Sequence, residues 1–301
     1  MAAFTAKDVQ ALRVQTGVGM MDCKNALTAA DGDFEKAVDI LREKGLAAAA
    51  KKAGRIAAEG IVDIVIDGGS GAVIEVNSET DFVSKNESFR EFVKLCARTI
   101  ISEQPKDVEA LHACKAPLGT IEEELREKIL TIGENIKIRR FEYYEGILIS
   151  YIHGGGTHAV MVKFDTSPQI ADMTEFTAFG RDVAMQIAAS APLYVSKDQV
   201  PSAEIDKERT ILLAQALNEG KTQNIAEKMV EGRIGKYYKD VVLLEQPFVK
   251  DDKMSVADYV KNTAAALGGE IKISAFTRYE KGEGLEKRSD DFAKEVADMQ
   301  K

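Results

Sequence analysis

The sequence predicts an α+β fold with an N-terminal three-helix module, duplicated α/β core subdomains, a projecting helical hairpin and a short C-terminal helix. Three observations support it: amphipathic stretches separated by glycines in residues 5–45, an internal repeat in mid-chain, and a charged helical stretch after Pro201. A chain of 301 residues is also long enough for two or three compact units.

The first helix is predicted from a capping box and an apolar stripe. Thr5 and Asp8 have the spacing at which each side chain can bond the backbone N–H of the other. Val9 and Leu12 supply the apolar stripe. Residues 16–19, Thr-Gly-Val-Gly, are expected to end the helix, because glycine readily adopts positive φ.

Two further helices complete the predicted module. Residues 20–30 are interpreted as the second helix, and Asp33 can cap the third after a turn. Phe34, Val38 and Leu41 fall on one face of that third helix, which we expect Gly45 to end. Residues 46–58, rich in alanine and basic side chains, are interpreted as a helical connector.

The middle of the chain contains a repeat with an offset of 86–87 residues. Three short patterns recur in the same order: Glu59-Gly60-Ile61 as Glu145-Gly146-Ile147, Ala72-Val73 as Ala159-Val160, and Phe89-x-x-Phe92 as Phe176-x-x-Phe179. Each copy is predicted to be a β-hairpin followed by a helix. The predicted strands are residues 60–66 and 72–76 in the first copy, and 146–152 and 158–164 in the second. Two similar α/β subdomains follow from this order.

The last hundred residues are predicted to begin with two helices. Ile205, Leu212 and Leu213 pattern one helix, residues 218–220 form the turn, and Ile225, Met229 and Val230 pattern the next. Strands are expected at residues 241–244 and 271–279. Residues 291–299 form a short amphipathic pattern through Phe292, Val296 and Met299.

These segments predict five structural units. The boundaries are residues 1–55 for the module and connector, 56–141 for the first core subdomain, 142–199 with 240–281 for the second, 200–239 for the inserted hairpin, and 282–301 for the C-terminal helical unit.

Composition favours a protein partner in a reducing cytoplasm. The net charge of −9 repels phosphate backbones, so direct nucleic-acid binding is not expected. No run of ~18 apolar residues is present, and the N-terminus does not resemble a secretory signal, so a membrane location is not expected either. The three cysteines include no C-x-x-C pair, which argues against a zinc site or a disulfide framework.

The sequence contains no convincing motif for bond-making chemistry. Gly220-Lys221-Thr222 resembles the end of a phosphate-binding loop, but Gln215 stands where the first glycine is required. His153 precedes three glycines as in some oxyanion holes, yet no G-x-S-x-G partner exists. We therefore expect neither enzyme activity nor a cofactor or metal of the chain's own.

Residues 75–87 leave two questions open. Glu75, Glu79 and Asp81 could perform acid–base work or hold a metal, but a solvated loop is the commoner explanation. Phe82 follows them, and residue type alone favours burial under the next helix. The alternative is an exposed aromatic anchor, the residue type that dominates interface hot spots.

Six runs of the sequence resemble the signature segments of the elongation factor Ts family. They are residues 16–24, 41–45, 75–86, 133–136, 225–233 and 246–249. The resemblance covers the whole chain, and Thr80-Asp81-Phe82-Val83 is its most specific part. It implies a guanine-nucleotide exchange factor of translation elongation that binds elongation factor Tu in its GDP-bound and nucleotide-free forms, disturbs its Mg²⁺ site and promotes GDP release.

The resemblance also implies roles for particular residues. The module would be ubiquitin-associated-like and would dock on the partner's nucleotide-binding domain. Thr80, Asp81, Phe82 and Val83 would form the loop that enters the partner near its Mg²⁺. The implied partner-binding residues are Arg13, Met20, Met21, Ile132, Gly133, His153 and, in the C-terminal helix, Phe292. The hairpin could support a homodimer.

Two rival functions remain at this stage. The first is a ubiquitin-type or peptide-docking protein without exchange activity, which would leave most of the chain without a role. The second is a small-molecule enzyme that uses the acidic residues near the loop.

Overall fold

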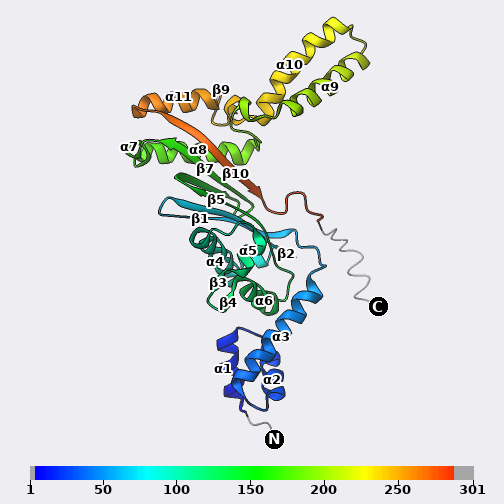
Figure 1. Cartoon of the computed structure of the whole chain (residues 1–301), viewed down its shortest axis with the longest axis vertical. Helices are drawn as coiled ribbons and strands as arrows, with labels where there is room; N and C mark the ends of the chain where they lie inside the picture. The colour runs from blue at the N-terminus through cyan, green and yellow to red at the C-terminus, as the bar shows by residue number, and fades with distance from the viewer. Residues whose placement is uncertain (1–3, 288–301) are drawn as a thin grey trace.

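The computed structural model describes residues 4–287. Within that range the N-terminal module precedes two stacked sheets covered by helices, and a helical hairpin extends from the far end (Figure 1). The helices are α1 Ala6–Thr16, α2 Met20–Ala29, α3 Phe34–Lys52, α4 Glu87–Glu103, α5 Val108–Ala113, α6 Ile121–Ile132, α7 Pro168–Ala171, α8 Thr174–Ser190, α9 Ser202–Asn218, α10 Gln223–Val241 and α11 Val256–Leu267. The strands are β1 Glu59–Asp67, β2 Ser70–Ser78, β3 Lys115–Ala116, β4 Gly119–Thr120, β5 Lys137–Glu145, β6 Ile147–His153, β7 His158–Thr166, β8 Pro247–Phe248, β9 Asp251–Ser255 and β10 Ile271–Glu280.

The start of the module follows the local sequence signals. Thr5 and Asp8 form the predicted capping box at the start of α1, and Gly17 ends that helix with φ of 67°. Asp33 caps α3 through the backbone N–H of Lys36. The three helices then bury a common apolar core, which includes Val9, Leu12, Cys23, Leu27, Ala37 and Leu41.

The prediction that Gly45 ends the third helix is wrong. Helix α3 continues to Lys52, and Gly45 is a buried interior residue that faces α6. An added Cβ at Gly45 would lie 3.8 Å from the carbonyl oxygen of Arg126 and from Leu130 Cδ2, so the two helices pack closely there. Packing against α6 therefore outweighs the weak helix propensity of glycine. The connector predicted over residues 46–58 is helical only as far as Lys52.

The predicted duplication is confirmed by the sheet topology. In the described residues one three-stranded sheet has the order β1-β2-β5 and the other three-stranded sheet has the order β10-β7-β6, beside the two-stranded pairs β3-β4 and β8-β9. The hairpins β1–β2 and β6–β7 are equivalent, as are the helices α4 and α8 that follow them. The structure extends the repeat to a third strand, since β5 joins the first sheet and β10 the second. Sequence reasoning missed β5, and the predicted boundary between residues 141 and 142 falls inside it.

The two sheets stack face to face between layers of helices. Ala72, Ile74 and Val76 on β2 face the core beneath α4, whereas Val160 and Val162 on β7 face the core beneath α8. The alternate side chains meet between the sheets in a cluster of Val62, Val73, Ala159, Met161 and Tyr279. Successive side chains of β2 and β7 thus point to opposite faces of their sheets, and both faces are buried. The core therefore has four layers, in the order helix, sheet, sheet and helix (Figure 1).

Each copy of the repeat is hydrogen-bonded to the other at its hairpin turn. The Gly146 N–H donates to the Gly69 carbonyl over 2.8 Å, and the Val62 N–H donates to the Gly156 carbonyl over 2.9 Å. Gly60 and Gly146, equivalent in the repeat, have φ of 109° and 122°. An added Cβ at Gly60 would lie 2.1 Å from the Val76 carbonyl oxygen, so close backbone approach requires glycine there, whereas at Gly146 it is the positive φ that favours glycine.

The hairpin consists of α9 and α10, as predicted, and is held at its base by a carboxylate. Glu204 accepts hydrogen bonds from the hydroxyl groups of Tyr194 and Tyr237. The strand expected at residues 241–244 is wrong, because α10 extends to Val241 and a 3₁₀ turn, Leu243–Glu245, follows. The strand expected at residues 271–279 is confirmed as β10. The C-terminal pattern that contains Phe292 lies outside the described residues.

The helices of residues 4–287 include none with the length and apolar character that a bilayer crossing requires.

Candidate functional site

The segment that joins β2 to α4 forms a short, internally bonded loop, residues 78–86, which we call the 78–86 loop. The hydroxyl of Ser78 donates to the Thr80 carbonyl over 2.9 Å. A 3₁₀ turn, Val83–Lys85, follows, and the Asn86 side chain then caps α4 by accepting from the Phe89 N–H. Caps and turns of this kind fix a loop through its own polar groups.

Adjacent residues in the 78–86 loop have opposite environments. Phe82 is 76% exposed, whereas Val83 is 5% exposed and packs into the core of the first subdomain. The prediction from residue type alone, that Phe82 is buried under α4, is therefore wrong. A large aromatic ring held in solvent by a buried neighbour is a surface suited to protein contact.

The 78–86 loop is hydrogen-bonded to the loop that follows α6. Glu134 accepts from the Thr80 N–H over 2.9 Å and from the Thr80 hydroxyl over 2.6 Å. Glu79 in turn accepts from the Asn135 N–H over 2.6 Å. Ile132 and Gly133 immediately precede this contact, and Gly133 ends α6 with φ of 87°. The structure thus brings together two predicted partner-facing loops.

A third loop is connected to these two through Arg90 on α4. Its Nε donates to the Ser84 carbonyl over 2.7 Å, and its Nη2 lies 3.3 Å from the Gly155 carbonyl oxygen. Gly155 belongs to the turn that starts at His153, and His153 is exposed. The Nδ1 of His153 lies 2.9 Å from the hydroxyl oxygen of Tyr151.

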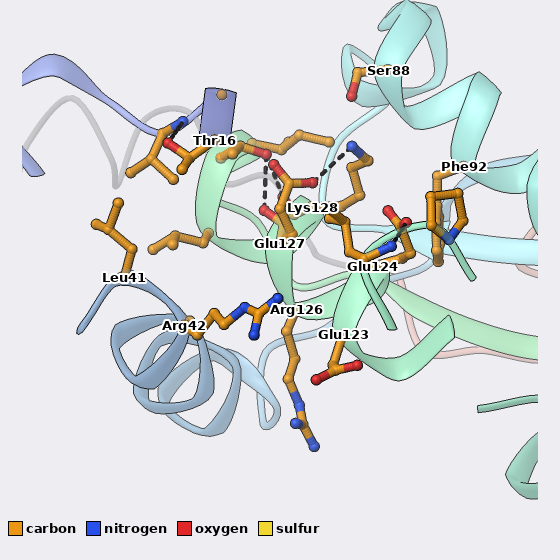
Figure 2. Close-up of a pocket in the computed structure, with 18 of the residues that line it drawn as sticks. Thr16, Leu41, Arg42, Ser88, Phe92, Glu123, Glu124, Arg126, Glu127 and Lys128 are labelled. Atoms are coloured by element: carbon orange, nitrogen blue, oxygen red, sulfur yellow. Dashed lines mark hydrogen bonds and ion pairs between the residues drawn. The ribbon is translucent and has the colours of Figure 1, made fainter. Parts of the chain in front are cut away.

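The residues predicted on the module lie apart from these loops. Arg13, Met20 and Met21 are exposed, and Met21 is 63% exposed. A groove of about 1100 Å³ separates the module from the first subdomain. Figure 2 shows Leu41 of the module on one side of this groove and Phe92 of the core on the other.

The connector beyond α3 also contacts these loops. Arg55 Nη1 lies 3.2 Å from Glu79 Oε1, and the Asn135 side-chain amide donates to the Arg55 carbonyl over 2.7 Å. Lys52 donates to the Ile129 carbonyl near the end of α6 over 3.2 Å. Burial, with the nearby positive charge of Arg55, lowers the pKa of Lys52.

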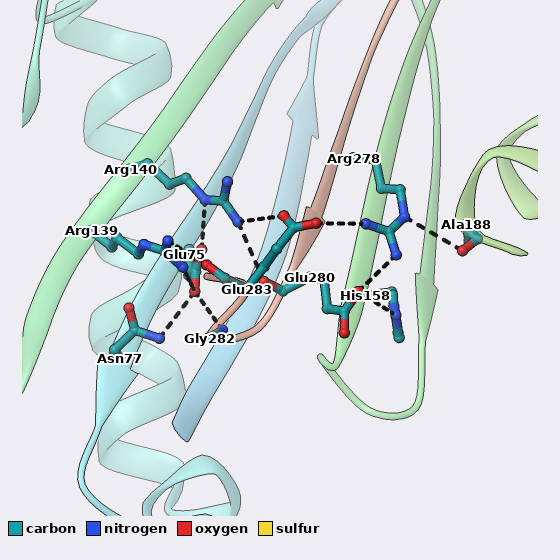
Figure 3. Close-up of polar contacts among 10 residues, drawn as sticks. All are labelled: Glu75, Asn77, Arg139, Arg140, His158, Ala188, Arg278, Glu280, Gly282 and Glu283. Carbon is teal, nitrogen blue, oxygen red and sulfur yellow. Dashed lines mark hydrogen bonds and ion pairs between the residues drawn. The ribbon is translucent and has the colours of Figure 1, made fainter. Parts of the chain in front are cut away.

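Glu75 does not belong to a solvated acidic loop. It is fully buried and accepts hydrogen bonds from Asn77, Arg139, Arg140 and the Gly282 N–H, at 2.6–3.0 Å (Figure 3). Burial opposes the charge of Arg140, but its bond to Glu75 and the charge of Glu75 raise its pKa. The explanation of Glu75 as part of a solvated loop is wrong: this carboxylate joins the first sheet to the segment after β10.

The acidic residues therefore do not converge on one site. Glu75 is bound by two arginines, Glu79 faces Arg55 and Asn135, and Asp81 is exposed. No group of three His, Cys, Asp or Glu side chains arranged to hold a metal occurs between residues 4 and 287. The arrangement offers one exposed aromatic side chain, Phe82, on a hydrogen-bonded loop rather than converging carboxylates.

Comparison with known proteins identifies the family to which this chain belongs. The family model described as Elongation factor TS matches residues 79–283, which span the 78–86 loop from Glu79 onward, strand β5 of the first sheet, the whole second sheet and the hairpin. The chain belongs to the elongation factor Ts family.

Full-length relatives agree with this assignment. The elongation factor Ts of Symbiobacterium thermophilum is 51% identical over 98% of this chain and 98% of its own length. Those of Syntrophotalea carbinolica and Clostridium kluyveri are 48% and 50% identical, over 99% and 97% of both chains. Membership of the elongation factor Ts family supports a nucleotide-exchange role in translation elongation.

Sequence reasoning about the site named residues that prove exposed, such as Asp81 and Phe82, and others that do not: Val83 is buried, and Thr80 and Ile132 are partly buried. It missed the residues that hold the 78–86 loop in place. Glu134, Arg90 and Arg55 were not singled out for any role, although Glu134 lies in a segment used to recognise elongation factor Ts. A carboxylate directly after the helix-ending Gly133 is the one local signal that could have indicated a loop contact. The partner-binding roles of Arg13, Met20, Met21, Ile132, Gly133 and His153 stay predictions, and Phe292 lies outside the described residues.

Proposed function

We propose that this member of the family is a guanine-nucleotide exchange factor for elongation factor Tu. It acts on the GDP-bound partner, inserting the Phe82 ring near the site that holds Mg²⁺ and the phosphates. The observation that carries the proposal is the exposure of Phe82 on a loop whose flanking residues are fixed. Nucleotide exchange takes place in the cytoplasm, and this chain makes or breaks no covalent bond.

The driving force is burial of the aromatic ring in the partner. Removing a phenylalanine side chain from water contributes about 1.5–3 kcal/mol. That energy is available only in the complex, so it can displace the partner's loops that hold Mg²⁺. A guanine nucleotide is held largely by Mg²⁺ and by backbone amides around its phosphates, so loss of the ion speeds GDP release.

Binding of this factor and binding of GDP are then thermodynamically coupled. If the factor weakens GDP binding, GDP must weaken binding of the factor by the same ratio. The stable species in the absence of nucleotide is therefore the complex of the two proteins. Excess GDP is expected to dissociate that complex.

The decisive experiment measures GDP release from elongation factor Tu with the Phe82→Ala variant. The maximal release rate should fall by about 10–100-fold, because the energy of burying the ring is lost. Val249→Ala serves as the matched control, since Val249 is also an exposed apolar residue, 46% exposed, but lies in the β8–β9 turn. Unchanged release by a folded Phe82→Ala protein would show that the ring is not the acting group.

The docking-only alternative makes a different prediction. A protein that binds through its three-helix module without exchange activity would leave GDP release at the intrinsic rate even at saturation. The same assay therefore separates the two functions.

A further inference from the structure

We propose that Glu134 is a positioning residue for exchange, acting through a reciprocal carboxylate clamp between the 78–86 loop and the loop after α6. The clamp is defined as Glu79, Thr80, Glu134 and Asn135. This inference rests on the proposed function, because it assigns Glu134 the task of holding Phe82 in the orientation that the partner meets.

The clamp is reciprocal in its chemistry. Each loop supplies one carboxylate and one backbone N–H: Glu134 accepts from the Thr80 N–H, and Glu79 accepts from the Asn135 N–H. Glu134 uses both oxygens, since its Oε1 accepts from the Thr80 hydroxyl over 2.6 Å. Hydrogen bonds to a charged acceptor are roughly twice as strong as those between neutral groups.

The clamp fixes one side of Phe82, and two other contacts fix the other side. Thr80 lies two residues before Phe82, whereas the buried side chain of Val83 and the Arg90 contact to Ser84 follow it. The exposed ring is therefore carried by a backbone held at both ends. Because these residues are ordered before binding, the complex does not have to lose their backbone conformational entropy when it forms.

The clamp also joins elements that are distant in sequence. Thr80 and Glu134 are 54 residues apart, and Arg55 adds the connector of the module through Glu79 and Asn135. A partner that contacts Ile132 or Gly133 would therefore contact residues directly next to Glu134, and through the clamp it could affect the position of Phe82. Glu134 acts through the loop, not by touching nucleotide or Mg²⁺.

The test compares Glu134→Ala with Glu134→Gln in the full chain, using GDP release from elongation factor Tu as a function of factor concentration. Glu134→Ala should lower the maximal release rate about tenfold, while the half-saturating concentration changes less than about threefold. Glu134→Gln should retain most of the rate, because an amide can accept from the Thr80 N–H and donate to its hydroxyl. Glu122→Ala, which removes a half-buried carboxylate of α6 paired with His112 and Arg126, is the control that should leave release unchanged.

A double-mutant cycle separates positioning from a general loss of structure. In the Phe82→Ala background, Glu134→Ala should have no further effect on release, because the group that it positions is absent. An equal tenfold loss in both backgrounds would overturn the proposal, as would wild-type release by Glu134→Ala. If instead Phe82→Ala itself releases GDP normally, the proposed function fails first, and the two failures are thereby distinguished.

Discussion

At the residue scale, exposure in the 78–86 loop is decided by which side chain fills the core. Val83 occupies the space beneath α4, and the turn Val83–Lys85 then directs Phe82 outward. Both residues are apolar, so burial energy alone does not choose between them. The hydrogen bonds of the 3₁₀ turn and of Thr80 make the choice, by fixing the backbone on which both side chains are carried.

The buried carboxylate of Glu75 gives a stability prediction at the same scale. Glu75→Gln should lower the free energy of unfolding by about 3 kcal/mol, because Arg139 and Arg140 lose their charged partner in a desolvated site. Urea denaturation of the purified chain measures the change. Glu142→Gln on β5 is the matched control, since Glu142 is exposed, and it should change stability by less than about 0.5 kcal/mol. Equal stability of the Glu75 and Glu142 variants would contradict the assignment.

At the element scale, two interior helical glycines have opposite surroundings. Gly45 in α3 has its nearest neighbours at 3.8 Å from an added Cβ, which is ordinary contact. Gly180 in α8 faces Ile149 of β6, whose Cδ1 would lie 2.0 Å and Cγ1 3.0 Å from an added Cβ. Helix propensity favours alanine at both positions, but only α3 has space for the methyl group.

Alanine substitutions at these glycines should therefore shift stability in opposite directions. Gly45→Ala should raise the free energy of unfolding by about 1 kcal/mol, the propensity difference between glycine and alanine. Gly180→Ala should lower it by about 1–2 kcal/mol, because overpacking against the stiff side chain of Ile149 exceeds that gain. Thermal unfolding followed by circular dichroism tests both, and shifts of the same sign would show that the packing difference is unimportant.

At the scale of the whole molecule, the predicted partner contacts in the described residues lie on the two core subdomains and, separately, on the module. The clamp, the Arg90 contact and the connector hold the 78–86 loop, the His153 turn and the end of α6 together. Arg13, Met20 and Met21 lie beyond the groove on the module. This separation predicts a division of labour, in which the module would contribute affinity for the partner and the 78–86 loop would contribute the exchange step.

The division of labour predicts different kinetic effects for the two parts. The Arg13→Ala, Met20→Ala double variant should raise the half-saturating concentration about tenfold, equal to about 1.4 kcal/mol, while the maximal release rate stays within about twofold. The matched control is Ile225→Ala in the hairpin, because Ile225 is also exposed, at 51%, and remote from the module. Wild-type affinity of the double variant would remove the module from the binding surface.

The sequence by itself determined the features that depend on neighbouring residues and on periodicity. The Thr5–Asp8 cap, the Asp33 cap, the two hairpins and the repeat all arise from contacts within a few residues, or from a pattern that occurs twice. Such signals can be read without knowing the rest of the fold, because backbone geometry and local hydrogen bonds set them.

Only the tertiary structure decided the features that depend on what packs nearby. The continuation of α3 through Gly45 involves packing on α6, the third strand β5 pairs with the edge of β2, and the 78–86 loop is anchored by Glu134, which is 54 residues from Thr80. In each case the feature depends on a contact with residues that are distant in the sequence. The sequence of either contacting segment alone does not indicate which distant residue of the chain it will contact.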